Sequence, residues 1–353
     1  MRQSPSPRTR LQAPVLVLFF LLLAGLCTGV PLFAVEPGPA TPPPDPSRPP
    51  TVPEKLFPAL YHTDWLRKAE HSDLTRPASV MSERDHLARE LAIANNTSPL
   101  LNNDVLAFYG SPLSPRMGIL GAWPRPALKV LLDEWALAYD EVNGRRGVMK
   151  AFYIIYGTAW PEGEIGILKD EILLPWIEYA LEHDILVYLD HQIGKYTVSQ
   201  AMDRILPYLR YPNVHLAIDP EWRTLKPMKE TGSVTATEVN AAQEQMQNYM
   251  LLHGIPGERQ LVIHQFKPVM IRNRDSVRSD FARVRLVHCA DGFGSPALKR
   301  LSYKMNAQAT NIPVKGFKLF FKSSYPGAGF DEPLMAPADV VSLEPRPWII
   351  MYQ

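Results

Sequence analysis

Two acidic side chains stand two residues apart in the apolar run Val214-His-Leu-Ala-Ile-Asp-Pro-Glu-Trp222. Side chains alternate between the two faces of a β-strand, so Asp219 and Glu221 are expected to point the same way. A carboxylic acid with a raised pKa beside an ionised carboxylate is the arrangement that breaks glycosidic bonds. The alternative is structural: Asp219 caps a loop or pairs with Arg223, and Glu221 is solvated.

Three further apolar runs also end in side chains that can bind a ligand. They supply Asp190, His191 and Gln192, then His264 and Gln265, and finally His288 and Asp291. Carboxylates, imidazoles and amides that converge on one pocket suit a polyhydroxylated ligand. The alternatives are that His264 is a buried core imidazole and that the two glutamines bond neighbouring strand ends.

A metal site is a second interpretation of the same groups. Its ligands would be Asp190, His191, Glu221, His264 and His288. No two of these histidines have the local spacing that defines a metal site, so the ligands would have to converge from several strands. Carboxylate chemistry without a metal or another cofactor is therefore the leading expectation.

Three more residues complete the candidate site. Lys318 lies within the apolar run Gly316–Phe321, where an ammonium is costly unless it is paired, so we expect an ion pair or exposure to solvent. A lysine that forms a Schiff base is the alternative. Tyr109 and Trp222 offer aromatic faces on which a sugar ring could stack, although packing beneath a loop is the other common use of such side chains.

Eight short runs rich in β-branched and aromatic residues position these groups, and each reads as a buried strand. The runs are Val105–Tyr109, Met149–Tyr156, Ile185–His191, Val214–Glu221, Gln260–Gln265, Val284–Asp291, Gly316–Phe321 and Trp348–Gln353. Helices are expected between them at Pro126–Asn143, Ile172–His183, Val198–Leu209, Ala236–Leu252, Ser276–Ala282, Pro296–Met305 and Pro337–Leu343. Alternating strands and helices in this number predict a single-domain (β/α)8 TIM barrel over residues 101–353. Such barrels keep their chemistry where the strands end, which is where the acidic residues and histidines fall.

Composition narrows the class of protein. The 353 residues carry a net charge of +1, with Lys and Arg scattered along the chain, so nucleic acid is not an expected partner. The only cysteines are Cys27 and Cys289, one in the N-terminal apolar stretch and one in a predicted buried strand. No disulfide is therefore expected to hold the fold.

The residues ahead of the barrel differ from it in composition. Residues 1–34 combine three arginines with an apolar run, which predicts a signal peptide or an uncleaved signal anchor, and hence export and a secreted or membrane-anchored location in the cell envelope. Residues 35–60 are rich in proline and predict a disordered linker. Residues 61–100 turn charged and predict a helical extension, with a helix after Ser82 that could cover the last strand.

The motif Asp219-Pro-Glu221 resembles the Asp-x-Glu of glycoside hydrolase barrels, most nearly the lysozyme-like muramidases, and Phe152-Tyr-Ile-Ile-Tyr-Gly157 is similar to another region of that family. The resemblance implies hydrolysis of a glycan. Phe108-Tyr109-Gly110 stands where the family has an aspartate early in the barrel, and Asp291 is the nearest match to its late aspartate. Residues 108–121 also resemble an uncharacterised group of exported bacterial proteins.

The leading hypothesis is an exported barrel that acts on a carbohydrate or cell-wall polymer. In it Glu221 donates the proton, Asp219 stabilises the developing cation, and Asp190 or Asp291 adds a carboxylate. The residues expected to hold the sugar are Tyr109, His191, Gln192, Trp222, His264, Gln265, His288 and Lys318. The two alternatives are the metal-dependent hydrolase and a barrel that binds glycan without cleaving it.

Overall fold

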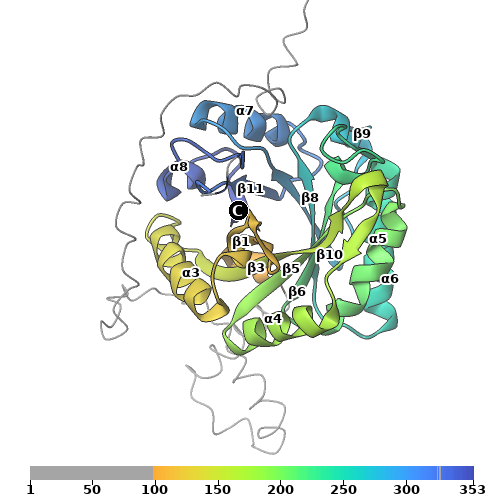
Figure 1. Cartoon of the computed structure of the whole chain (residues 1–353), viewed down its shortest axis with the longest axis horizontal. Coiled ribbons are helices and arrows are strands. Elements are labelled where there is room, and N and C mark those ends of the chain that lie inside the picture. Colours follow the sequence, from red (N-terminus) through yellow and green to blue (C-terminus); the bar gives the residue numbers. More distant parts are fainter. Residues whose placement is uncertain (1–97, 324, 326) are drawn as a thin grey trace, which may run out of the picture. The chain divides into compact units, whose positions relative to one another are not determined.

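The computed structural model of the chain describes residues 98–323, 325 and 327–353. Within them eight parallel strands form a closed barrel with helices around it, which confirms the predicted TIM barrel (Figure 1). The barrel strands are β1 Asn103–Ser111, β3 Gly147–Ala159, β5 Ile185–Gln192, β6 Val214–Asp219, β8 Arg259–Gln265, β10 Val284–Ala290, β11 Lys315–Leu319 and β12 Pro347–Tyr352. They pair in that order, and β12 returns to β1 to close the ring.

Helices follow most of the strands, as the sequence predicts. They are α3 Arg125–Asp140, α4 Asp170–Glu182, α5 Val198–Ile205, α6 Ala236–Leu252, α7 Pro296–Ala307 and α8 Pro337–Val341. The start of α6 is fixed by a capping box, in which the Thr235 side chain accepts the amide of Glu238 and the Glu238 carboxylate accepts that of Thr235. The predicted bounds of α6 therefore agree with the observed ones.

The helix predicted at Ser276–Ala282 is wrong. The backbone there bonds to side chains of other elements: Asn240 accepts the Arg278 amide at 2.8 Å, and Gln243 donates to the Arg278 carbonyl at 2.8 Å. Asn311 also donates to the Val277 carbonyl at 2.9 Å. Because these partners satisfy the backbone groups, no α-helical bonds are needed, and residues 277–283 form no helix between the 3-10 turn at Arg274–Ser276 and β10.

Two apolar layers are separated by the barrel wall. The outer layer packs helices against one face of the strands and includes Phe152, Leu189 and Ile263. The inner layer fills the barrel, and its members include Tyr153 and Val262 from the same strands. Since side chains alternate along each strand, a residue's position in its strand decides whether it faces the barrel interior or the helices.

Short strands outside the barrel were not predicted. β2 Ser114–Gly118 turns back antiparallel to β1, and β4 Ile165–Ile167 does the same against β3. Met117 of β2 packs against the inner apolar layer, so this hairpin lies over one end of the barrel. β7 Val234–Thr235 and β9 Ile271–Arg272 form a separate parallel pair.

The predictions for residues 1–34 and 35–60, and that for 61–100 up to residue 97, fall outside the described residues; Pro99–Leu101 forms a 3-10 turn. The signal peptide or anchor, the proline-rich linker and the helical extension therefore stay predictions. In the described part of the chain, no helix combines the length and the apolar character needed to cross a bilayer.

Candidate active site

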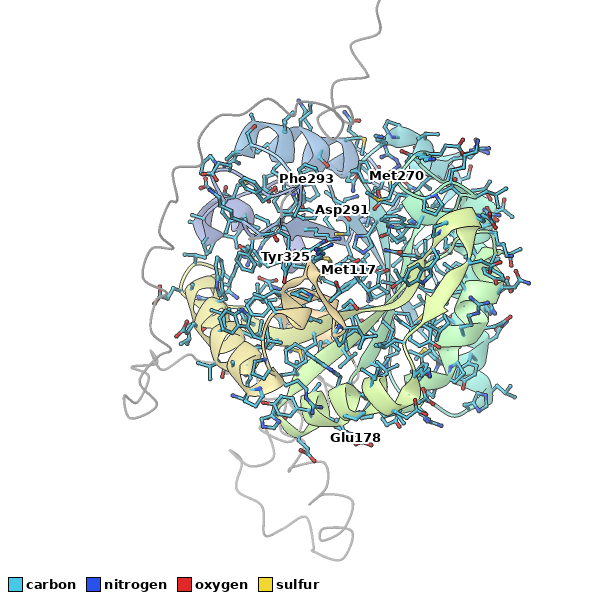
Figure 2. All side chains as sticks on the ribbon, in the orientation of Figure 1. Met117, Glu178, Met270, Asp291, Phe293 and Tyr325 are labelled. Atoms are coloured by element: carbon cyan, nitrogen blue, oxygen red, sulfur yellow. The ribbon has the colours of Figure 1, made fainter. Side chains whose placement is uncertain are left out.

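Six polar side chains enter the barrel interior at the carboxyl ends of five strands or in the first position beyond a strand. We call them the interior cluster: Tyr109, Asp190, Asp219, His264, Asp291 and Lys318. All are at most 5% exposed, and all were predicted as site residues. Figure 2 shows Asp291 near the middle of the ring of helices. The closed barrel thus brings together groups that are up to 209 positions apart in the sequence, from Tyr109 to Lys318.

Asp291 is the hub of the interior cluster. Its Oδ2 lies 3.1 Å from Nδ1 of His264 and accepts a hydrogen bond from the Lys318 ammonium at 3.3 Å. Its Oδ1 accepts the backbone amide of Gly292 at 2.7 Å. The Nε2 of His264 is in turn 2.8 Å from the hydroxyl of Tyr153, so Asp291, His264 and Tyr153 form a continuous hydrogen-bonded chain.

Asp190 and Asp219 differ from Asp291 because each keeps a carboxylate oxygen without a partner. The Tyr109 hydroxyl donates to Oδ2 of Asp190 at 2.8 Å, but Oδ1 of Asp190 is buried and unbonded. Oδ1 of Asp219 is likewise buried and unbonded. Buried polar atoms are nearly always hydrogen-bonded, so two unsatisfied acceptors on adjacent strands mark a place where a ligand could supply donors.

Glu221 reaches the interior cluster by a different route from the one predicted. β6 ends at Asp219, and Pro220–Trp222 forms a 3-10 turn, so strand alternation does not extend to Glu221. Burial and the neighbouring charge of Asp291 nonetheless raise the pKa of Glu221 to about 8. With this pKa, Glu221 is an acid that is protonated at neutral pH. Because it is only half-buried, it is also open to a substrate.

The two carboxyls of the Asp-x-Glu motif affect each other. Burial raises the pKa of Asp219 well above its ordinary value, and the charges of Glu221 and Asp190 raise it further. Lys318 acts against these effects for both groups. Because the two carboxyls are coupled, their protons leave in steps that belong to the pair.

Lys318 and Asp291 stabilise each other's charge. Burial disfavours the charge on each, but the carboxylates of Asp291, Asp219, Asp190 and Glu221 outweigh it and raise the pKa of Lys318. For Asp291, burial is outweighed by Lys318 and by the bond to His264, so its pKa is lowered. The ammonium also lies 3.7 Å from the centre of the Tyr109 ring. Lys318 is therefore a charged member of an ion pair, as expected, and not a neutral amine poised for a Schiff base.

Three residues predicted for the site are not part of the interior cluster, because they point outward into the helical layer. The His191 ring lies 5.8 Å from that of Tyr156, which belongs to the outer apolar layer, and burial lowers the pKa of His191 to about 4. His288 Nε2 lies 2.8 Å from Oε1 of Gln265. The three residues are His191, Gln265 and His288. Strand alternation explains their outward direction, because each is an odd number of positions from an inward-facing residue: Asp190, His264 and Asp291 respectively.

Gln192 and Trp222 lie at strand ends. Oε1 of Gln192 accepts the backbone amide of Ala159 at 2.7 Å, which is the strand-end bond that we weighed against ligand contact. Trp222 follows Glu221 in the 3-10 turn and is half-buried. Tyr153 was not predicted as a site residue; it binds His264 and stacks on Tyr188 with ring centres 5.1 Å apart. Its alternation with Ala151 along β3 is the signal that could have placed it inside.

The metal-dependent alternative loses two of its ligands in this arrangement. His191 and His288 face the helices, so they cannot share a site with Asp190, Glu221 and His264. In the described residues, no group of three histidine, cysteine or acidic side chains is placed to hold a metal ion. Cys289 is buried and unpaired inside the barrel.

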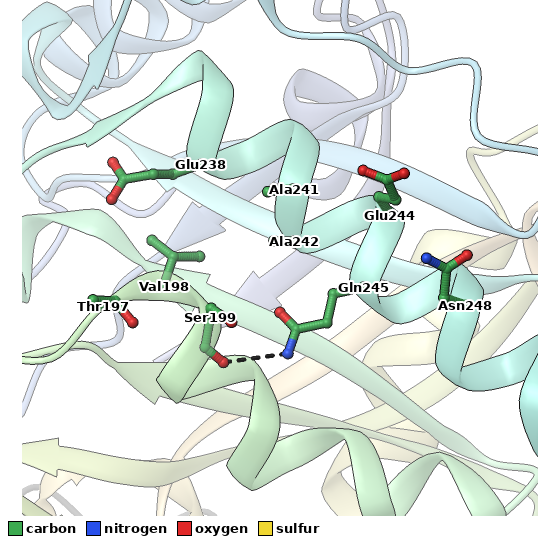
Figure 3. Close-up of a pocket in the computed structure, with 9 residues that line it drawn as sticks. All are labelled: Thr197, Val198, Ser199, Glu238, Ala241, Ala242, Glu244, Gln245 and Asn248. Carbon is green, nitrogen blue, oxygen red and sulfur yellow. Dashed lines mark hydrogen bonds between the residues drawn. The ribbon is translucent and has the colours of Figure 1, made fainter.

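A separate groove lies between α5 and α6 on the outside of the barrel (Figure 3). Its volume is about 520 Å³, and its lining includes Val198, Ala241, Ala242 and Gln245. None of the candidate catalytic residues lines it. The groove is therefore distinct from the interior cluster.

Comparison with known proteins adds the following. No protein-family model matches the chain, and no curated protein matches it. Among solved structures, a GH18 chitinase from Flavobacterium johnsoniae is 10% identical with a TM-score of 0.39, covering 71% of this chain and 87% of its own. The catalytic domain of a GH18 chitinase from the fern Peteris ryukyuensis is 13% identical with a TM-score of 0.40, covering 70% of this chain and 90% of its own.

A secondary alcohol dehydrogenase is also similar, at 14% identity and a TM-score of 0.30, with 62% of this chain and 69% of its own covered. Identities and scores this low concern the barrel fold alone. The muramidase resemblance gains no support from these structures. Two of these three similar structures are glycoside hydrolases.

Proposed function

We propose that this chain hydrolyses glycosidic bonds in a carbohydrate polymer by carboxylate acid/base chemistry. The observation that carries the proposal is the pair at the end of β6: Glu221, half-buried with its pKa raised to about 8, two positions from the buried carboxyl of Asp219. Pairs of carboxyls whose environments separate their roles are the usual machinery of glycoside hydrolysis.

Each residue has a role in this scheme. Glu221 passes its proton to the glycosidic oxygen as the bond from that oxygen to the anomeric carbon breaks. The positive charge that develops on the sugar faces the carboxyl-rich interior, where the ionised carboxylate of Asp291 stabilises it. Asp219 and Asp190 orient the sugar through their unbonded acceptor oxygens. A water molecule then adds its oxygen to the anomeric carbon and returns a proton to the carboxylate of Glu221.

The unbonded oxygens of Asp190 and Asp219 support a substrate rich in hydrogen-bond donors. Sugar hydroxyls are such donors, and Trp222 beside Glu221 adds an aromatic face. Export belongs to the proposal through residues 1–34, whose composition suits a signal peptide or anchor. Cell-wall glycan is accordingly the first substrate to test.

The proposal predicts how activity depends on pH. Because Glu221 must be protonated to act, kcat is expected to fall as pH rises through about 8, the pKa of Glu221. The measurement is release of reducing ends from purified peptidoglycan and from soluble N-acetylglucosamine hexasaccharide between pH 5 and 10. A rate that stays constant from pH 7 to 10 would exclude Glu221 as the acid.

The deep burial of Asp190 and Asp219 favours a second candidate function, which is binding of glycan without cleavage. Asp190 is fully buried and Asp219 is 1% exposed, so a glycan could rest on Glu221 and Trp222 without reaching the deeper carboxyls. Retention of peptidoglycan with no reducing ends released would support this candidate. Release of reducing ends that depends on Glu221 would exclude it.

A further inference from the structure

Lys299 is a fully buried lysine that the proposed mechanism does not use. It lies on α7, outside the barrel wall, and is 1% exposed. Its ammonium donates to the carbonyl oxygen of Gly292 at 2.5 Å and to that of Lys318. A buried ammonium is costly, so its partners indicate what it is there to hold.

Asp331 completes the same arrangement from the loop after β11. Its Oδ2 lies 3.6 Å from the Lys299 ammonium. Its Oδ1 accepts the Gly294 amide at 2.9 Å, and its Oδ2 accepts the Phe320 amide at 3.0 Å. Lys299 and Asp331 together therefore bind two backbone groups after β10, a third at the end of β11 and a fourth just beyond it.

These backbone groups belong to, or adjoin, the ion pair of the interior cluster. Gly292, whose carbonyl Lys299 holds, donates its own amide to the carboxylate of Asp291. The second carbonyl is that of Lys318 itself. Asp291 thus follows β10, and Lys318 lies at the end of β11. Lys299 and Asp331 bind the backbone at both of these strand ends.

We propose that Lys299 and Asp331 are positioning residues, which hold the ends of β10 and β11 at the spacing that keeps Lys318 against Asp291. The inference deepens the proposed function and rests on it for its effect on activity. Its structural part, the spacing of the ion pair, does not depend on any substrate.

The Lys299→Met variant tests the inference through the titration of Lys318. If the strand ends separate, Lys318 moves away from Asp291, and its pKa falls by at least about half a unit. Loss of the Lys299 charge alone would instead raise the pKa of Lys318, because the two ammonium charges repel each other. The probe is NMR of 13C-labelled lysine side chains in the full-length chain, with the Lys318 signal assigned from Lys318→Arg.

The Asp331→Asn variant gives an independent test through Glu221, and it serves if Lys299→Met does not fold. Lys318 lowers the pKa of Glu221, so a displaced Lys318 raises it. Loss of the negative charge of Asp331 alone would lower it. Carboxyl NMR of 13C-labelled glutamate distinguishes the two directions without a substrate.

Lys315→Met is the matched control. Lys315 is also 1% exposed and lies on β11, but its ammonium donates to the carbonyls of Asn306, near the end of α7, and Ala309, just beyond it, both at 2.8 Å. Like Lys299→Met, this variant loses a buried ammonium, here from the strand that carries Lys318. It should leave the titrations of Lys318 and Glu221 within about 0.2 units of the wild type.

Activity provides the last readout. The inference expects kcat to fall about tenfold or more in both positioning variants while KM changes less than about twofold. It is overturned if the Lys318 pKa rises in Lys299→Met, if the Glu221 pKa falls in Asp331→Asn, or if either titration matches that of Lys315→Met. If the titrations shift as expected but Glu221→Gln keeps full activity, the positioning stands and the proposed function fails.

Discussion

Glu221→Gln is expected to lower kcat for glycan hydrolysis by about 10²- to 10⁴-fold, the contribution of a general acid. Glutamine has nearly the shape of the protonated side chain but cannot give up a proton to the glycosidic oxygen. KM should change little, because at neutral pH the wild-type carboxyl is already uncharged, with its pKa near 8. The measurement is initial-rate release of reducing ends at pH 6.5.

The fold should tolerate this change. Burial raises the pKa of Glu221 above its value in the unfolded chain, so ionisation destabilises the wild type progressively as pH rises from about 4.5 to about 8. Glu221→Gln removes that effect and should be equally stable at pH 4 and more stable at pH 9. Glu244→Gln, on α6, is the surface control for activity. Wild-type rates in Glu221→Gln would reject the assignment of the proton donor.

Lys318→Met is expected to have the largest effect on stability, a loss of about 3 to 5 kcal/mol in the free energy of unfolding at pH 7. It leaves Asp291 buried without the ammonium that keeps it ionised. Because Lys318 and His264 lower the pKa of Asp291 below its unfolded value of about 3.8, their stabilisation is present above that value. The difference between wild type and variant should therefore shrink as pH falls below 4. Urea unfolding at pH 7 and pH 3.5 measures it.

A second substitution separates stability from function. Lys318→Met combined with Asp291→Asn removes both buried charges, so most of the lost stability should return. Activity should not return, because the interior cluster has lost the groups that set the charge around Glu221. A double variant no more stable than Lys318→Met would contradict the ion pair as described.

The barrel could be predicted from sequence because its strands carry a strong local signal. Each predicted run overlaps one observed strand, since β-branched and aromatic residues bounded by turn residues specify a buried strand without distant partners. The helix at Ala236–Leu252 is also specified locally, because a capping box at Thr235 fixes its start in the structure. Ser276–Ala282 failed because Asn240, Gln243 and Asn311, from other elements, bind its backbone.

Only part of the site could be predicted, because the sequence position of a residue at a strand end does not give the direction of its side chain. Position at a strand end identified Asp190, Asp219, His264 and Asp291, but it does not say which face a side chain occupies. Once Asp190 points inward, the adjacent His191 must point outward. Consistent use of this alternation would have excluded His191, Gln265 and His288 from the interior and included Tyr153.

Other features depend on tertiary contacts that no local pattern encodes. Lys299 reads as an ordinary lysine of an amphipathic helix, and only the packing of α7 against β10 and β11 makes it fully buried. Glu221 stands in a 3-10 turn after β6, where the charges of Asp291 and Lys318 act on its pKa, although a continuous strand was expected there.

The claim on which the account depends is that ring closure gathers carboxyl groups around Glu221 and keeps it protonated at neutral pH. Carboxyl NMR of 13C-labelled glutamate in the wild-type chain, with the Glu221 signal assigned from Glu221→Gln, tests it most directly. The account predicts a titration midpoint for Glu221 of about 8. A midpoint near the ordinary glutamate value of about 4.3 would contradict it.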